Sequence, residues 1–328
     1  MAEPLLEIAG LRVGFPVGGV RVDALGGVDL RIDHGEAVGI VGESGSGKSL
    51  TALAIMRLVS PPGRIEGGAI RLMGRDLLEL GERGMRSVRG REISIVFQDS
   101  LTSLNPAFTI GRQLVDVIST HQRLGGRAAR AEAREALALV GIAPERLDAY
   151  PHEFSGGMRQ RVLIAMAVAC RPKLLIADEP TTALDVTVQA QIMRLLARLR
   201  AELGLSLLFI THNLDLMAEI CDRAYVLYGG KVMETAPVEE LFGAPRHPYT
   251  QRLLECIPRL ADFERPLTPI PGQPPALGGS LSGCPFEPRC PKAVGLCRTN
   301  PPALLGDGHR EACWIAQGIA GAEARPSP

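Results

Sequence analysis

The sequence predicts an α/β fold with a parallel core sheet, an inserted helical subdomain and a small loop-rich C-terminal extension. Three continuous apolar runs predict the sheet: "AVGIVG" at 37–42, "LLIAD" at 174–178 and "LSLLFI" at 205–210. These runs do not alternate with polar residues, which indicates parallel strands covered on both faces. The amphipathic stretch "TVQAQIMRLLARLRAELG" at 187–204 predicts a helix between the last two strands, ended by glycine.

Two segments depart from the strand and helix alternation. From about residue 111 to 171 the pattern is helical, most clearly in "RAARAEAREALALVGI", so we place the inserted subdomain at about 100–171. After about residue 245 proline and glycine dominate, as in "RPLTPIPGQPPALGGSLSG", which excludes long regular elements. The predicted boundaries are therefore an α/β domain over 1–245 and an extension over 246–328.

Composition excludes several classes of function. The chain has 328 residues, of which 46% are apolar, and 36 basic residues balance 36 acidic ones. A neutral chain offers no electrostatic case for nucleic acid as its main partner. The N-terminus lacks a basic segment followed by an apolar one, so secretion is not expected. The longest apolar run has nine residues, 162–170, whereas a bilayer span needs about 20.

The stretch "GESGSGKS" fits the phosphate-binding pattern G-x-x-x-x-G-K-[ST]. Its glycines let backbone N–H groups turn toward phosphate oxygens, Lys48 can reach the β- and γ-phosphates, and the Ser49 hydroxyl can bind Mg²⁺. The alternative is a glycine-rich turn with a coincidental lysine, which the strand before and the helix after disfavour. The expected ATP-binding residues are Gly42, Glu43, Ser44, Gly45, Ser46, Gly47, Lys48 and Ser49.

Two carboxylates follow the second predicted strand. Asp178 ends "LLIAD", where it can hold Mg²⁺ through water beside the phosphates, and Glu179 can polarise an attacking water. The alternative is a strand that simply runs into an acidic turn. The presence of the phosphate-binding pattern in the same chain disfavours this alternative.

A serine and two glycines, Ser155, Gly156 and Gly157 in "FSGGMRQR", open a predicted helix and offer a second site for an anion. An ordinary serine N-cap is the alternative. With "LLIADE" about twenty residues later, the chain resembles the ATP-binding subunit of an ABC transporter over about residues 5–242. The ordered motifs are Walker A at Gly42–Ser49, the Q-loop at Gln98, the signature at Phe154–Met158, Walker B at Leu174–Asp178, the catalytic Glu179, the D-loop at Ala183–Asp185 and the switch His212.

The resemblance implies a P-loop NTPase of the ABC ATPase type, in which two subunits enclose two ATP molecules. The signature residues Ser155, Gly156 and Gly157, with Asp185 of the D-loop, then act at the partner's ATP. The resemblance further implies that His212 contacts the γ-phosphate and that Gln98 senses the membrane subunits. Mg²⁺ would be held by Ser49, Gln98 and Asp178. Phe15 is the candidate for stacking on adenine, although a core position for it is an equal alternative.

Within the family, the sequence is most similar to the dipeptide and oligopeptide importer ATPases. The stretches "FQDSLTSLNPAFTIGRQL", "HEFSGGMRQR" and "HPYTQRLLECIPRL" carry this similarity. It implies peripheral attachment at the cytoplasmic face of the bacterial inner membrane. The implied partners are a second ATPase subunit (a paralogue, giving a heterodimer), two integral membrane permease subunits and an extracytoplasmic solute-binding protein.

Three alternatives remain beside peptide import. The same branch includes importers for nickel, glutathione and other small solutes. A soluble ABC-type ATPase without a transporter is disfavoured by the single ATPase unit and by the lack of a heptad run. An ordinary P-loop kinase lacks "SGG" before Walker B.

Four cysteines, Cys284, Cys290, Cys297 and Cys313, lie in the extension with five, six and fifteen residues between them. A reducing compartment disfavours disulfides, and zinc sites usually have closer ligand pairs. The pattern is similar to the tail of peptide-importer ATPases that hold a 4Fe–4S cluster. We therefore predict that these cysteines bind a 4Fe–4S cluster, with structural zinc as the alternative, and that the metal holds together a tail with little apolar surface.

Overall fold

The structure is a computed structural model. It describes all residues except 1–2, 99–102, 183, 258–268, 276–281 and 320–328. The chain divides into two compact units. Unit 1 consists of the residues up to Leu5, Ile32–Ala37 and Glu79–Ile210, and unit 2 consists of Leu6–Arg31, Val38–Leu78 and the residues from Thr211 onward.

Three parallel strands form the sheet of unit 1. They are β6 (Ile93–Val96), β7 (Leu174–Asp178) and β8 (Ser206–Ile210), with β7 in the middle. Every residue of β7 and β8 is buried. The prediction of a parallel core sheet is confirmed, because unalternated apolar strands require cover on both faces.

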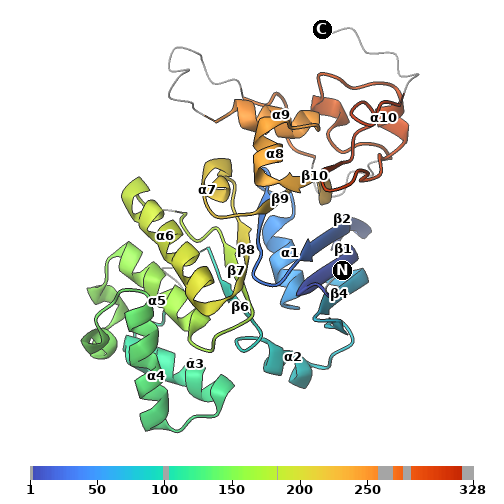
Figure 1. Cartoon of the computed structure of the whole chain (residues 1–328). Coiled ribbons are helices and arrows are strands. Elements are labelled where there is room, and N and C mark those ends of the chain that lie inside the picture. The colour runs from blue at the N-terminus through green and yellow to red at the C-terminus, as the bar shows by residue number, and fades with distance from the viewer. Residues whose placement is uncertain (1–2, 99–102, 183, 258–268, 276–281, 320–328) are drawn as a thin grey trace. The chain divides into compact units, whose positions relative to one another are not determined.

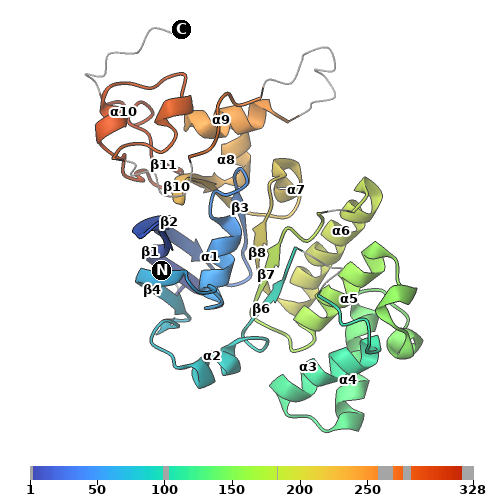
Figure 2. The same ribbon diagram turned by 180° about the vertical axis from the view of Figure 1, so that it is seen from behind.

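Most helices of unit 1 follow β6 in the chain, in the region predicted to be helical. They are α2 (Glu82–Val88), α3 (Ile110–Gln122), α4 (Gly126–Leu139), α5 (Gly156–Val168) and α6 (Val186–Leu203), with 3₁₀ turns at Pro144–Asp148 and Pro151–Glu153. In both views α5 lies between α6 and the pair formed by α3 and α4 (Figures 1 and 2). Three of the buried residues of α3, Ile110, Leu114 and Ile118, are four apart, so they form one apolar stripe.

Unit 2 contains two groups of paired strands. The antiparallel group has the order β2 (Val20–Ile32), β1 (Leu6–Val17), β4 (Arg64–Leu72) and β5 (Arg75–Asp76). In the other group β3 (Ala37–Val41) pairs in parallel with β9 (Arg223–Tyr228), and β9 pairs with β10 (Lys231–Pro237). The two-residue strand β11 (Arg310–Glu311), from the extension, pairs with β10.

The helices of unit 2 are short. They are α1 (Lys48–Ile55), α7 (Leu214–Ala218), α8 (Val238–Gly243), α9 (Pro248–Glu255) and α10 (Leu296–Thr299), with a 3₁₀ turn at Glu287–Arg289. The segment of the extension that carries α10 lies beside α9 and β10 (Figures 1 and 2). No helix in the described part of the chain is long and apolar enough to span a bilayer.

Candidate functional site

The loop Gly42–Ser49 joins β3 to α1 in a conformation that depends on glycine. Gly42, Gly45 and Gly47 have φ angles of 152°, 78° and 104°, which residues with a Cβ rarely adopt. A Cβ on Gly42 would also lie 2.2 Å from the carbonyl oxygen of Leu227. The loop therefore holds its compact shape only with glycine at these positions.

Lys48 is folded back into this loop. Its side chain is buried, and Nζ donates to the carbonyl oxygens of Gly42 and Glu43, each at 2.9 Å. The backbone N–H of Ser46 donates to the Glu43 carbonyl oxygen at 3.2 Å. These contacts place a positive charge inside a ring of backbone groups, which suits a phosphate group.

Two further features of the loop favour an anion. Helix α1 begins directly after Gly47, which has no side chain to cap it, so the positive end of the helix dipole lies at the loop. The buried Ser46 Oγ has no hydrogen-bond partner among the described residues. A buried hydroxyl without a partner costs free energy, and a ligand oxygen would satisfy it.

In unit 1, the end of β7 presents two carboxylates in different settings. Asp178 is buried, and Glu179 is half-buried with a φ of 47°, a left-handed conformation that is uncommon for glutamate. Glu179 Oε2 accepts hydrogen bonds from Gln98 Nε2 and Thr182 Oγ1, each at 2.9 Å. The backbone N–H of Glu179 donates to Ile210 at the end of β8. The strand end thus directs the Glu179 carboxylate toward Gln98.

Helix α5 begins at the signature sequence. Ser155 is its N-cap, with Oγ accepting from the Met158 N–H at 3.4 Å. Ser155 is exposed and the two following glycines are half-buried. A Cβ on Gly157 would lie 2.5 Å from Val188 in α6, so glycine permits close packing of the two helix starts. Asp185 is exposed and caps α6 by accepting from the Val188 N–H at 2.9 Å.

The two remaining candidates belong to unit 2. His212 is exposed and directly follows Thr211, whose N–H donates to Ile40 in β3. Phe15 lies in β1 and is half-buried; a Cβ added to Gly63 would be 2.4 Å from its ring. Of the predicted residues, Gln98 and Glu179 are joined within unit 1, and the members of the phosphate loop are joined within unit 2. The Q-loop, Walker B and signature residues are in unit 1, as is Asp185 of the D-loop, whereas Ala183 of the D-loop lies outside the described residues.

Sequence reasoning missed three residues that contact the predicted site. Thr182 binds Glu179, Tyr249 accepts from the Glu43 N–H at 2.9 Å, and Arg289 binds both carboxylate oxygens of Glu43. Nothing local could reveal the last two contacts, because they join parts of the chain that are 206 and 246 residues apart. For Thr182, its spacing of three residues from Glu179 was the available signal.

Comparison with known families agrees with this geometry. Residues 25–182 match the ABC transporter family, and residues 233–297 match the C-terminal region of oligopeptide/dipeptide transporters. A probable peptide ABC transporter ATP-binding protein of Sinorhizobium fredii is 50% identical, over 95% of each chain. The oligopeptide transport ATP-binding protein OppD of Bacillus subtilis is 48% identical, over 95% of this chain and 88% of that protein. The chain belongs to the ABC transporter ATP-binding family.

Solved structures of this family share the fold. The ABC cassette MJ0796, in a dimeric post-hydrolysis state bound to ADP and Pi, has a TM-score of 0.63 and 28% identity, covering 71% of this chain and 98% of that one. The protein cbiO1 of Clostridium perfringens, part of the transporter complex cbiONQ, has a TM-score of 0.65 and 27% identity, covering 74% and 92%. The chain is thus an ABC ATPase, which binds ATP and Mg²⁺.

The extension of this ABC ATPase has an apolar core. Phe286 is fully buried, and its ring centroid is 5.4 Å from that of Tyr228 and 5.2 Å from that of Tyr249. Tyr228 and Tyr249 are themselves 4.6 Å apart. Ala293 and Val294, in the same segment, are buried as well. This core holds the segment around Phe286 against β9 and against α9 of the same extension.

The prediction of a 4Fe–4S cluster on Cys284, Cys290, Cys297 and Cys313 is wrong. No group of three or more His, Cys, Asp or Glu side chains in the described residues could hold a metal ion, which also removes the zinc alternative. The four cysteines line a cavity of about 10 Å³, which is room for one water at most. Burial raises the pKa of Cys284 to about 12 and that of Cys290 to about 11. The prediction assumed a tail with little apolar surface, whereas Phe286 and its neighbours supply a core.

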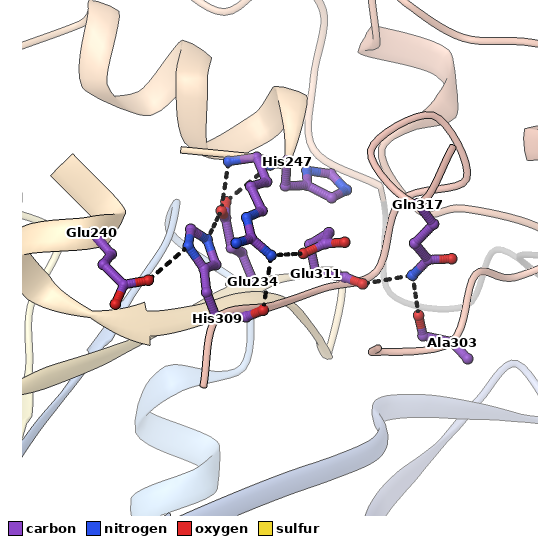
Figure 3. A network of polar contacts seen from close by, with 8 residues as sticks. Glu234, Glu240, His247, Ala303, His309, Glu311 and Gln317 are labelled. Atoms are coloured by element: carbon purple, nitrogen blue, oxygen red, sulfur yellow. Dashed lines mark hydrogen bonds and ion pairs between the residues drawn. The ribbon is translucent and has the colours of Figure 1, made fainter. Parts of the chain in front are cut away.

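A buried polar network joins the extension to β10 (Figure 3). Glu234 is fully buried and accepts from the backbone N–H groups of Arg246 and His247 at 2.6 and 3.1 Å. Its Oε1 is also 2.7 Å from His309 Nε2. Arg246 in turn bonds the carbonyl oxygen of His309 and the carboxylate of Glu311. Because every carboxylate oxygen of Glu234 has a partner, its burial is compensated.

Proposed function

We propose that this ABC ATPase is the ATP-hydrolysing subunit of a membrane importer for dipeptides and oligopeptides. The observation that carries the proposal is the match of residues 233–297 to the oligopeptide/dipeptide transporter C-terminal region, in a chain 50% identical to a probable peptide transporter subunit. The ATPase domain would comprise residues 1–245, with a helical subdomain at about 100–171, and the peptide-importer extension would comprise 246–328.

The phosphate loop is proposed to bind ATP through Gly42–Ser49. Its left-handed glycines, the buried Lys48 and the unpartnered Ser46 hydroxyl support this assignment. Phe15 would stack on the adenine, since it is only half-buried. Backbone N–H groups at the start of α1 would receive the phosphate charge.

Glu179 is the proposed general base for the attacking water. Its hydrogen bonds from Gln98 and Thr182 hold the carboxylate in one orientation, as a general base requires. Ser49, Gln98 and Asp178 would hold Mg²⁺, which neutralises the charge that develops on the phosphate oxygens. His212 would contact the γ-phosphate.

The remaining candidates are proposed to act across a dimer. Ser155, Gly156 and Gly157 at the start of α5, with Asp185, would face the ATP bound by a second ABC ATPase, a paralogue of this chain. Their exposed or half-buried state supports this role. The other partners would be two integral membrane permease subunits and an extracytoplasmic solute-binding protein, with the chain peripheral to the cytoplasmic face of the bacterial inner membrane.

Copurification and transport test the proposal. The chain, purified from its native cell, is expected to bring down two membrane subunits and a second ATPase; recovery with ribosomes instead would contradict it. In proteoliposomes, the complex is expected to take up labelled dipeptides or oligopeptides only with ATP and the binding protein. Uptake of nickel or glutathione in place of peptides would assign the machinery to another solute.

A further inference from the structure

Every side-chain nitrogen of Arg289, in the extension, donates a hydrogen bond, and two of them donate to Glu43 of the phosphate loop. Nη1 donates to Glu43 Oε2 at 2.6 Å and to the Tyr228 hydroxyl at 3.1 Å, and Nη2 donates to Glu43 Oε1 at 3.0 Å. Nη2 also bonds the carbonyl oxygen of Ile270, and Nε bonds that of Pro271. The Arg289 side chain is only 5% exposed. A buried, bidentate pair of this kind fixes both side chains.

Glu43 is also hydrogen-bonded, through its backbone, to other residues of the loop and of the extension. Its backbone N–H donates to the Tyr249 hydroxyl in α9, so the extension holds both its main chain and its side chain. Its carbonyl oxygen accepts from Lys48 Nζ and from the Ser46 N–H. The residue that receives Arg289 is therefore bonded directly to the lysine of the loop.

We propose that Arg289 is a positioning residue for ATP binding: it neutralises the Glu43 carboxylate and turns it away from the phosphates. The inference rests on the proposed role of Gly42–Ser49 in binding the phosphates. Without a cation beside it, Glu43 would set a negative charge in the loop that receives a polyanion, and like charges in a partly buried site repel. Glu43 would also be free to draw Lys48 toward itself and away from ATP.

The charge state of the pair agrees with this role. Hydrogen bonding to Glu43 raises the pKa of Arg289 above its ordinary value, so the guanidinium stays charged. The Glu43 side chain is 25% exposed, so its charge is only partly screened by water. In this way the extension supplies a cation to a loop more than two hundred residues earlier.

Four full-length proteins test the proposal: wild type, Arg289→Met, Glu43→Gln and the double variant. Arg289→Met is expected to raise the Kd for ATP about tenfold, because the Glu43 carboxylate is then not neutralised and repels the phosphates. Glu43→Gln is expected to tighten binding up to about threefold, because Arg289 then keeps its charge with no carboxylate beside it. In the double variant Kd is expected to return to within about twofold of wild type. In the complete transporter, Arg289→Met should raise KM for ATP while kcat stays within about twofold.

A second ion pair of the same extension is the matched control. Arg298 binds Glu287 at 2.9 Å, and both residues of this pair lie in the extension; Arg298→Ala should leave the Kd for ATP unchanged. If Arg289→Met does not fold, Arg289→Lys replaces it. This variant is expected to raise the Kd for ATP about two- to fourfold, and adding Glu43→Gln is expected to abolish that rise. Unchanged affinity without Arg289, or a loss that Glu43→Gln does not correct, overturns the proposal. Failure of the wild type itself to bind ATP would overturn the nucleotide site instead.

Discussion

At the scale of single residues, Lys48 carries the charge of the phosphate loop. It is held by the carbonyl oxygens of Gly42 and Glu43, so it is already in place for a phosphate group. Lys48→Ala removes charge-assisted hydrogen bonds to the phosphates and is expected to weaken ATP binding about 10- to 100-fold. Equilibrium titration with ATP and Mg²⁺ measures this loss. Lys292→Ala, at an exposed lysine bonded to Gln251, is the control, and equal affinity in both variants would contradict the role.

Glu179 is the proposed general base, so hydrolysis is expected to depend on it. Glu179→Gln keeps the size of the side chain but removes the basic carboxylate, so kcat is expected to fall about 100- to 10,000-fold. ATP binding should persist and a closed dimer should accumulate, which size-exclusion chromatography with ATP can detect. Glu145→Gln, at an exposed carboxylate paired with Arg134 in the same unit, should hydrolyse ATP normally. A normal rate of ATP hydrolysis in Glu179→Gln would contradict the assignment of Glu179 as the general base.

His247 makes the stability of the extension depend on pH. Burial lowers its pKa to about 3, against about 6.5 in the unfolded chain. Between these values the unfolded chain binds a proton that the folded chain does not, so stability is lost as pH falls below about 6.5, by up to about 1.4 kcal/mol per pH unit. His247 Nδ1 caps α9 by accepting from the Tyr249 N–H at 3.0 Å, and asparagine can replace that acceptor.

His247→Asn is therefore expected to flatten the dependence of unfolding free energy on pH between about 6.5 and 5, by about 1 kcal/mol per pH unit. Urea unfolding at several pH values measures this slope. The slope that remains in the variant belongs to other titratable groups. Identical slopes in the variant and the wild type would show that His247 is not kept neutral by the fold.

At the scale of elements, helix α5 begins at an exposed residue, Ser155, which is also its N-cap. Ser155→Ala removes the acceptor for the Met158 N–H, which costs about 1 kcal/mol of stability. If the helix start acts across a dimer, ATP binding to the isolated chain should stay unchanged. Hydrolysis in the dimer should fall about tenfold or more, since a donor to the partner's phosphate is lost. Equal damage to ATP binding by the isolated chain would show that the cap is only structural.

Elements were predicted well wherever the signal was local. The apolar runs at 37–42, 174–178 and 205–210 correspond to β3, β7 and β8, because buried parallel strands need unbroken apolar sequence. The helix expected at 187–204 is α6, which ends at Gly204 in the left-handed conformation. The short strand β11 was not predicted, since two residues carry no periodicity and form a strand only by pairing with β10.

At the scale of the whole molecule, the extension is anchored through Phe286. Its ring packs edge-on against Tyr228 and beside Tyr249, and no part of it reaches solvent. Phe286→Ala is expected to lower the unfolding free energy by about 3–5 kcal/mol, because a buried aromatic leaves a cavity. Chemical denaturation followed by tyrosine absorbance measures the loss. Leu305→Ala, at a side chain 52% exposed in the same extension, should change stability little; equal effects in both variants would contradict the anchor.

The sequence by itself determined the α/β fold, the phosphate loop and the order of the ABC motifs. These depend on residues close together in the chain, such as Gly42, Gly47 and Lys48, whose chemistry is fixed by backbone conformation and spacing. Only the tertiary structure decided what holds the extension and what it touches. The cysteine spacing suggested a metal, but burial of Phe286 against Tyr228 and Tyr249 supplies a core in its place. The pair of Glu43 and Arg289 joins residues 246 positions apart, and such a contact arises from packing of the folded chain, which no local pattern encodes.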